Sequence, residues 1–220
     1  MSRIFSTGPI CLLLRFSRKV ERIGLTAENP FECNQESIRL VKNRRNEGGE
    51  GFSAEQLNEA QDAVADKAAR FISVQNEYNM LNRAVEVDVL PECRRLNIAF
   101  LPFFPLASGL LTGKYRKGDL APPGARFGPG GFSAHLFNDK TLATVEALSE
   151  NAAQHGQTPL QLAFSWLLRY SEIPSVIAGA MTPDQVRANA SAYVGPLSGV
   201  QLQEIDRILG SSHAERGVVG

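Results

Sequence analysis

From residue 52 onward, short apolar runs alternate with segments of helical periodicity, and this alternation constrains the fold more than any other feature of the sequence. The apolar runs cover residues 71–78, 98–106 and 175–180. A strand–helix order that repeats along the chain is typical of α/β proteins, in which right-handed helical crossovers join parallel strands. The pattern therefore predicts a parallel sheet that is covered by helices.

Helix-start signals separate these runs. Ser53 is followed three residues later by Gln56, a capping-box pattern that predicts a helix over about 54–67. Thr158–Pro159 and Thr182–Pro183 place proline at the first helical position, where it favours initiation. The other predicted helices cover 85–96, 139–155 and 197–209, the helix that Thr182 opens ends near Tyr193, and a long loop rich in glycine and proline spans 107–138.

Residues 1–51 differ from the rest of the chain. The first twenty residues contain several Ser and Thr, no acid, and the basic side chains Arg3, Arg15, Arg18 and Lys19. This composition resembles a mitochondrial transit peptide, and a poorly ordered or mistranslated leader is the alternative. We expect an atypical leader over 1–51, disordered or frame-disrupted, then an α/β unit over 52–210 and a short tail over 211–220.

Charge and cysteine content exclude several classes of protein. The 23 Lys and Arg residues balance 23 Asp and Glu residues, so the basic surplus of a nucleic-acid binder is absent. The cysteines (Cys11, Cys33 and Cys93) form no CxxC pair, which argues against a zinc site and favours a reducing compartment. The apolar stretch 98–111 contains prolines and falls short of the ~20 residues that a membrane span needs. We expect a cytoplasmic protein without a metal site, nucleic-acid partner or membrane partner.

Polar segments follow the first two predicted strands. The amide of Gln75 can hydrogen-bond a ligand in both directions or satisfy backbone groups at a strand end. Segment 103–115 (FFPLASGLLTGKY) carries glycines that let backbone N–H groups approach phosphate. Lys114 adds charge, Phe103 a flat face for stacking, and Arg126 a second cation. The alternative is a surface loop with solvated charges.

A third polar segment follows the last predicted strand. The strand stops at Gly179, and the helix that Thr182 opens has an N-terminus suited to an anion. Gln185 and Asn189 are four residues apart, share one helix face and can reach the edges of a purine. A plain capped helix is the alternative. Because barrels often bind phosphate with the loops after their last two strands, the pair of loops favours a binding site.

Together these segments resemble the aldo-keto reductase superfamily. The motifs FSAEQL, VQNEYNMLNR, LPFFPLASGLLTGKYRKG, PPGAR, TPLQLAFSWLLR and SVIAGAMTPDQVRANASA occur in the family's order and spacing between residues 52 and 209. The similarity is greatest to the bacterial branch that also includes potassium-channel β subunits. It implies an α/β fold, a (β/α)8 TIM barrel that uses NADPH to reduce small-molecule carbonyl substrates. This chain would supply a partial barrel, strands six to eight with their helices, with the N-terminal strands missing.

The resemblance also assigns cofactor contacts. It implies that Gln75 holds the nicotinamide carboxamide, that Phe103 stacks on the ring, and that 105–111 line the pyrophosphate. Met181 departs from the Ser, Lys or Arg often found beside the adenosine 2′-phosphate, so NADH is not excluded as the cofactor. The implied cofactor-binding residues are Gln75, Phe103, Pro105, Leu106, Ser108, Gly109, Leu111, Lys114, Arg126, Gly179, Thr182, Gln185 and Asn189.

The catalytic residues of the family have no counterpart in this sequence. The family's proton donor is a Tyr, helped by Lys, His and Asp, all from the early strands. Residues 1–70 contain no Tyr and no His, and the first Asp is Asp62. Losing a positioned acid typically costs about 10²–10⁴-fold in rate. We expect no catalytic residues and an inactive isolated chain, which would need a missing N-terminal half as partner; a nucleotide-binding or regulatory module without turnover and a non-functional remnant are the alternatives.

Overall fold

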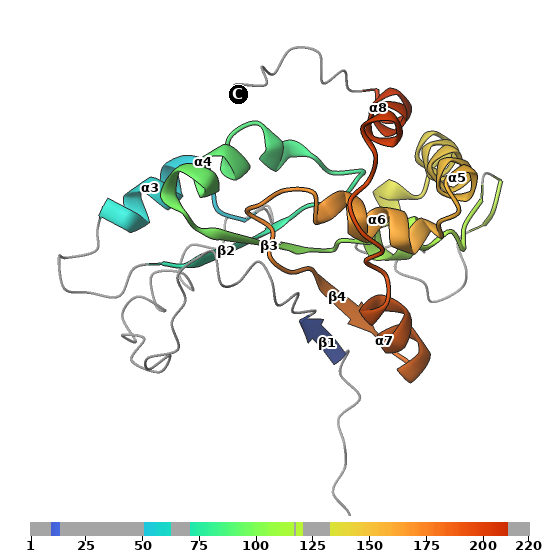
Figure 1. The fold of residues 1–220 in the computed structure, drawn as a ribbon, viewed down its shortest axis with the longest axis horizontal. Helices are drawn as coiled ribbons and strands as arrows, with labels where there is room; N and C mark the ends of the chain where they lie inside the picture. The colour runs from blue at the N-terminus through green and yellow to red at the C-terminus, as the bar shows by residue number, and fades with distance from the viewer. Residues whose placement is uncertain (1–9, 14–50, 63–70, 117, 121–132, 211–220) are drawn as a thin grey trace, which may run out of the picture.

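The computed structural model describes residues 10–13, 51–62, 71–116, 118–120 and 133–210. Within these ranges the fold is mixed α/β, with short strands between the helices (Figure 1). The strands are β1 (Ile10–Leu13), β2 (Ser73–Glu77), β3 (Ala99–Phe103) and β4 (Ile177–Ala180). The α-helices are α3 (Ala54–Asp62), α4 (Val89–Leu96), α5 (Asp139–Gln154), α6 (Pro159–Leu167), α7 (Pro183–Ala190) and α8 (Gly199–Ile208). Short 3-10 turns are η2 (Ala84–Glu86), η3 (Ala107–Thr112) and η4 (Ala134–Leu136).

β2 and β3 form the predicted parallel pair, with Gln75 opposite Leu101. Because successive side chains of a strand point to opposite faces, one face of this pair carries Val74 and Phe100. Both are buried in the hydrophobic core, together with residues of α3 and α4 such as Leu57 and Leu90. In Figure 1 these two helices lie along one side of the pair. The other face carries Gln75, which is exposed.

The prediction of one parallel sheet is wrong for the last strand. β4 pairs antiparallel with β1, with Ile10 opposite Ala180 and Leu13 opposite Ile177. The described strands therefore form two separate two-stranded ladders, so the closed arrangement of a barrel stays a prediction. The apolar run of residues 175–180 indicates that a strand is buried, but it carries no information on which strand pairs with it.

Several element boundaries differ from prediction for local reasons. The helix expected over 85–96 is broken into η2 and α4, because the Asp88 carboxylate accepts from the Val89 N–H at 2.7 Å and caps a new helix. β3 ends at Phe103, since Phe104 adopts a left-handed φ of 49° that a strand cannot continue through. α3 ends at Asp62, and the rest of the helix predicted there lies outside the described residues.

Helix starts follow the sequence signals closely. Ser53 and Gln56 form the predicted capping box: the Gln56 N–H donates to Ser53 Oγ at 3.3 Å, and the Ser53 N–H donates to Gln56 Oε1 at 3.0 Å. Thr158 caps α6 with a second capping box and Pro159 at the first turn. The predicted initiation sites of α3, α6 and α7 are therefore confirmed.

A buried cluster of charges joins η2 and α8 to residues that lie just after β2, just before η2 and just after α6. The Glu86 carboxylate accepts from Tyr78 Oη at 2.6 Å, from Arg83 Nη2 at 2.6 Å and from Arg169 Nη2 at 3.0 Å. The Arg169 guanidinium also lies 3.6 Å from the ring centroid of Trp166, a cation–π geometry. We call Tyr78, Arg83, Glu86, Arg169 and Asp206 the Glu86 cluster; Asp206 Oδ1 lies 3.4 Å from Arg83 Nη1.

Candidate functional site

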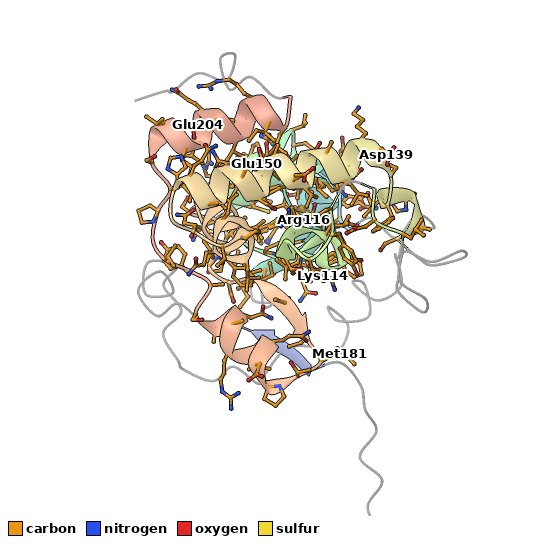
Figure 2. The ribbon with its side chains drawn as sticks, turned by 90° about the vertical axis from the view of Figure 1, so that its right-hand side faces the viewer. Lys114, Arg116, Asp139, Glu150, Met181 and Glu204 are labelled. Carbon is orange, nitrogen blue, oxygen red and sulfur yellow. The ribbon has the colours of Figure 1, made fainter. Side chains whose placement is uncertain are left out.

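A pocket of about 530 Å³ lies between η3, β4 and α7. We call it the η3 pocket. Its wall comes from two segments of the chain, 104–115 and 178–189, with one residue of α6 between them. Lys114 comes from the first segment and Met181 from the second, and Figure 2 shows both on the side of the molecule that faces the viewer.

We call segment 104–115 the η3 wall, and several of its residues have uncommon backbone conformations. Phe104, Ala107 and Ser108 have positive φ values of 49°, 46° and 58°, and Gly109 follows at 102°. Such conformations cost free energy in non-glycine residues and cluster at binding sites. The N–H groups of Ala107 and Gly109 already donate within the turn, to Phe104 O and Leu106 O. The turn therefore offers a ligand a shaped surface more than free backbone donors.

Lys114 supplies the charge of the η3 wall. A Cβ atom placed on Gly109 would lie 3.1 Å from Lys114 Nζ, so the ammonium group rests directly against the glycine. Its nitrogen lies 4.9 Å from the ring centroid of Tyr115. Among the described residues no carboxylate pairs with Lys114. The pocket therefore presents a cation that can bind an anionic ligand.

We call segment 178–189 the β4–α7 wall; the side chains by which it lines the pocket are uncharged, and two of them are amides. Thr182 caps α7 by accepting from the Gln185 N–H at 3.2 Å, and Gln185 Oε1 accepts from the Met181 N–H at 2.7 Å. Asn189 is only 4% exposed, yet its carboxamide bonds no other described residue. Asn189 also lines the pocket, so its carboxamide is placed to hydrogen-bond a ligand there. Beside Gly179 the space is empty, because an added Cβ would meet nothing within 4 Å.

The structure brings most of the predicted cofactor residues to this pocket. Those that line it are Pro105, Leu106, Ser108, Gly109, Lys114, Gly179, Gln185 and Asn189. Their assignment to a dinucleotide stays a prediction.

The remaining predicted residues lie elsewhere. Gln75 is the middle residue of β2 rather than its end, and Phe103 is half-buried at the end of β3. Leu111 is a core residue at 3% exposure, and Thr182 acts as the cap of α7. Arg126 lies outside the described residues.

Sequence reasoning gave no role to several residues of the pocket wall. These residues are Phe104, Thr112, Tyr115, Leu160, Ala178, Ala180 and Ala188. Phe104 stood beside the predicted Phe103, and their ring centroids are 5.3 Å apart, so the aromatic pair was a usable signal. Leu160 and Ala188 are ordinary apolar helix residues, and nothing in their local sequence marks them.

Two further findings concern the described part of the chain. No group of three or more His, Cys, Asp or Glu side chains in it is placed to hold a metal ion. None of its helices combines the length and apolar character that crossing a membrane requires.

Comparison with known proteins identifies the family. The sequence profile of the aldo/keto reductase family matches residues 45–209. The chain therefore belongs to the aldo/keto reductase family, and the resemblance noted from its motifs is confirmed.

Individual relatives agree with this assignment. The chain is 33% identical over 142 residues to the NADH-specific methylglyoxal reductase of Escherichia coli K12, covering 64% of this chain and 41% of the relative. It is 34% identical over 140 residues to L-glyceraldehyde 3-phosphate reductase of E. coli O157:H7, covering 60% and 40%. It is 35% identical over 173 residues to a probable voltage-gated potassium channel subunit beta of Arabidopsis thaliana, covering 74% and 52%. The chain thus spans about half or less of the length of these relatives.

Proposed function

We propose that the η3 pocket binds a nicotinamide adenine dinucleotide, as part of an oxidoreductase that reduces small-molecule aldehydes and ketones. The observation that carries the proposal is that one pocket has on its two walls a cation, Lys114, and an amide, Asn189, neither of which forms an ion pair or a side-chain hydrogen bond with the described residues. A dinucleotide needs both, because its pyrophosphate is anionic and its adenine edge takes paired hydrogen bonds.

The residues present fit such a ligand. Lys114 against Gly109 would hold the pyrophosphate by charge. Asn189 and the Nε2 of Gln185, which donates to none of the described residues, would face the adenine and its ribose, since side-chain amides pair well with the N6 and N7 edge of adenine. A volume of about 530 Å³ is also in the usual range of about 300–1,000 Å³ for ligand pockets. Gln75 and Phe103 stay the proposed nicotinamide contacts.

The chemistry that the ligand supplies is a hydride for the carbonyl carbon of a substrate. The alkoxide that forms needs a proton, and family resemblance assigns that proton to residues absent from 1–70. Tyr78 is no substitute: it is fully buried and its hydroxyl donates to Glu86. We therefore propose that this 220-residue chain binds the dinucleotide without turning over substrate. The reductase names of two relatives support carbonyl compounds as the substrate class.

A regulatory module is the second candidate function. The similarity to a probable potassium channel subunit beta supports it, because that protein's name denotes an accessory subunit. Such a module would bind the dinucleotide and report its oxidation state to a partner.

Calorimetric titration of the chain with NADH and NADPH tests the proposed site. Saturable binding of at least one dinucleotide is expected. Lys114→Ala should weaken it about tenfold, the worth of one charge-assisted contact. Lys140→Ala is the matched control, because Lys140 is exposed on α5 and does not line the pocket. Absence of saturable binding, or equal losses in the two variants, would overturn the proposal.

Turnover is tested separately, with methylglyoxal and DL-glyceraldehyde as carbonyl probes. Absorbance of the reduced nicotinamide should stay constant in the presence of the chain and either probe. Consumption by wild type above the level of Lys114→Ala would show that the chain is an enzyme on its own and would overturn the proposal of binding without turnover.

A further inference from the structure

We infer that Ser133 is a positioning residue of the η3 pocket, which acts through Ser108 and holds the η3 wall in its ligand-binding shape. The inference rests on the proposed function and deepens it, because it names what keeps the pocket preformed. Ser133 does not line the pocket, so its effect on a ligand passes through a residue that does.

Ser108 is a strained residue of the η3 wall that lines the pocket. Its φ of 58° and ψ of 17° lie in the left-handed region. A Cβ atom disfavours that region, and residues stay in it only where the surrounding structure enforces the conformation. Gly109 follows directly, and the ammonium group of Lys114 rests against Gly109. A change in the conformation of Ser108 would therefore also shift the surface that supports the cation of the pocket.

Ser133 supplies a partner for the Ser108 hydroxyl from 25 residues away. The two Oγ atoms are 2.7 Å apart, and either of them can be the donor. Ser133 is 1% exposed, and a buried hydroxyl needs a hydrogen-bond partner. It directly precedes η4, a position from which a serine hydroxyl often caps the helix that follows, yet it makes no such cap bond. Its hydroxyl therefore serves the contact with Ser108.

Ser133 is in turn held in place by α5. Asn138 caps α5 by accepting from the Thr141 N–H at 3.0 Å, and its side-chain amide donates to His135 O of η4 at 3.0 Å. α5 packs into the hydrophobic core through residues such as Leu142. η4 is thus fixed to a regular helix, and the Ser133 hydroxyl links that helix to the η3 wall.

A second contact joins η4 to the same wall. The ring of Phe137, which directly follows η4, meets the ring of Tyr115 edge to face, with the centroids 5.5 Å apart. Tyr115 lines the pocket, and Lys114 Nζ lies 4.9 Å from the centroid of its ring. The segment around η4 therefore restrains the wall at two points, at Ser108 by a hydrogen bond and at Tyr115 by packing.

Calorimetric titration of the full 220-residue chain with NADH tests the role in binding. Ser133→Ala should weaken binding about fivefold, the worth of one neutral hydrogen bond. Ser108→Ala should weaken it by the same factor, and the double variant by no more than either single, since the two residues share one interaction. Ser149→Ala is the matched control, because the Ser149 hydroxyl donates to Val145 O at 2.8 Å and does not line the pocket; it should bind as wild type does.

Glycine at position 108 separates positioning from a general loss of stability. Because glycine adopts a positive φ without the penalty of a Cβ atom, it depends less on the bond from Ser133. Ser108→Gly combined with Ser133→Ala should therefore bind NADH about threefold more tightly than Ser108→Ala combined with Ser133→Ala. Equal affinities of the two double variants would overturn the role of Ser133 in holding the left-handed conformation.

Amide hydrogen exchange tests the inference without a ligand. The N–H groups of Gly109 and Leu111 both donate to Leu106 O, so their exchange reports whether η3 opens. Ser133→Ala should speed this exchange about fivefold, and Ser149→Ala should leave it unchanged. Unchanged exchange in Ser133→Ala, or NADH affinity equal to that of wild type, overturns the inference and leaves the proposed function intact. If wild type binds no dinucleotide, the proposed function fails, and the exchange rates still decide whether Ser133 holds η3.

Discussion

The Glu86 cluster and the η3 pocket use similar side chains in opposite ways. In the cluster, the one carboxylate of Glu86 accepts from Tyr78, Arg83 and Arg169, so its hydrogen-bonding capacity is used within the protein. In the pocket, Lys114 forms no ion pair with a carboxylate of the described residues, and the Asn189 carboxamide forms no hydrogen bond with any of them. A closed polar network stabilises the fold, whereas an open one keeps its capacity for a ligand.

The Glu86 cluster and the η3 pocket also differ in backbone conformation. In the cluster, Glu86 lies in η2 and Asp206 in α8. Tyr78 directly follows β2, Arg83 directly precedes η2 and Arg169 lies two residues after α6, and none of the five residues has a positive φ. The pocket is shaped by the positive-φ run of Phe104, Ala107 and Ser108. Strained backbone persists where the surrounding structure enforces it, and its clustering at sites is expected. Substitutions in the cluster should therefore lower stability, and substitutions in the pocket should lower binding.

Glu86→Gln should give the largest loss of stability. The amide keeps the shape of the side chain but removes its charge, leaving Arg83 and Arg169, only 16% and 11% exposed, without their main anion. Breaking a buried ion pair on one side costs about 3–5 kcal/mol. Urea unfolding measures the loss, and Glu150→Gln on the exposed surface of α5 is the control (Figure 2). Similar midpoints for the two variants would contradict the closed-network description.

The difference in unfolding free energy between wild type and Glu86→Gln should depend on pH. Burial alone raises the pKa of Glu86, but hydrogen bonds from Arg83 and Tyr78 and the charges of both arginines outweigh it, so the pKa is lowered. A carboxyl with a lowered folded pKa stabilises the fold above its unfolded pKa of about 4.3, and this is lost as pH falls through the folded value. The stability gap between wild type and Glu86→Gln should be full at pH 7 and narrow below about pH 4. A gap that is constant from neutral to acidic pH would contradict this origin.

Tyr78→Phe should have a smaller effect on the same cluster. Burial raises the pKa of the Tyr78 hydroxyl, which Arg169 only partly offsets, so the group remains a donor to Glu86 well into the alkaline range. Removing one hydrogen bond to a charged group costs about 1.5–3 kcal/mol. In a double-mutant cycle with Glu86→Gln, the two losses should be smaller together than their sum, because they share one interaction. Additive losses would show that the Tyr78 hydroxyl stabilises the fold independently of Glu86.

The sequence predicted those features that depend on neighbouring residues. The capping box at Ser53 and the helix start at Thr158–Pro159 are each encoded within four residues of chain, and both are present in the structure. The antiparallel pairing of β4 with β1 joins residues far apart in sequence, and no local signal encodes it. Local sequence also does not encode the end of β3. Phe104 is in the left-handed conformation there, and its carbonyl oxygen accepts from the side-chain amide of Asn79, 25 residues away, at 3.1 Å.

In the candidate site, too, local sequence predicted some residues, and others depend on tertiary packing. Lys114, Gln185 and Asn189 stand out by residue type and spacing, and they line the pocket. Leu160 lines it only because α6 packs against η3, which a helical apolar pattern does not specify. Gln75 was expected at a strand end and lies in the middle of β2 instead, since β2 extends to Glu77. Position along an element is therefore the weakest part of such a prediction.

Alanine substitutions of two glycines should change stability least, and they test most directly how the η3 pocket differs from the Glu86 cluster. Gly109 and Gly156 both have positive φ, 102° and 67°, so an alanine at either position costs about 1 kcal/mol in backbone strain. Only at Gly109 does the new methyl group meet Lys114 Nζ, at 3.1 Å; at Gly156 it meets nothing within 4 Å.

Thermal unfolding should therefore show similar losses for Gly109→Ala and Gly156→Ala, while titration with NADH separates them. Displacing the ammonium group should weaken binding by Gly109→Ala about tenfold. Gly156→Ala should bind as wild type does. If both variants bound equally well, the contact between Gly109 and Lys114 would not serve the ligand, and the pocket would lose the feature that distinguishes it from the Glu86 cluster.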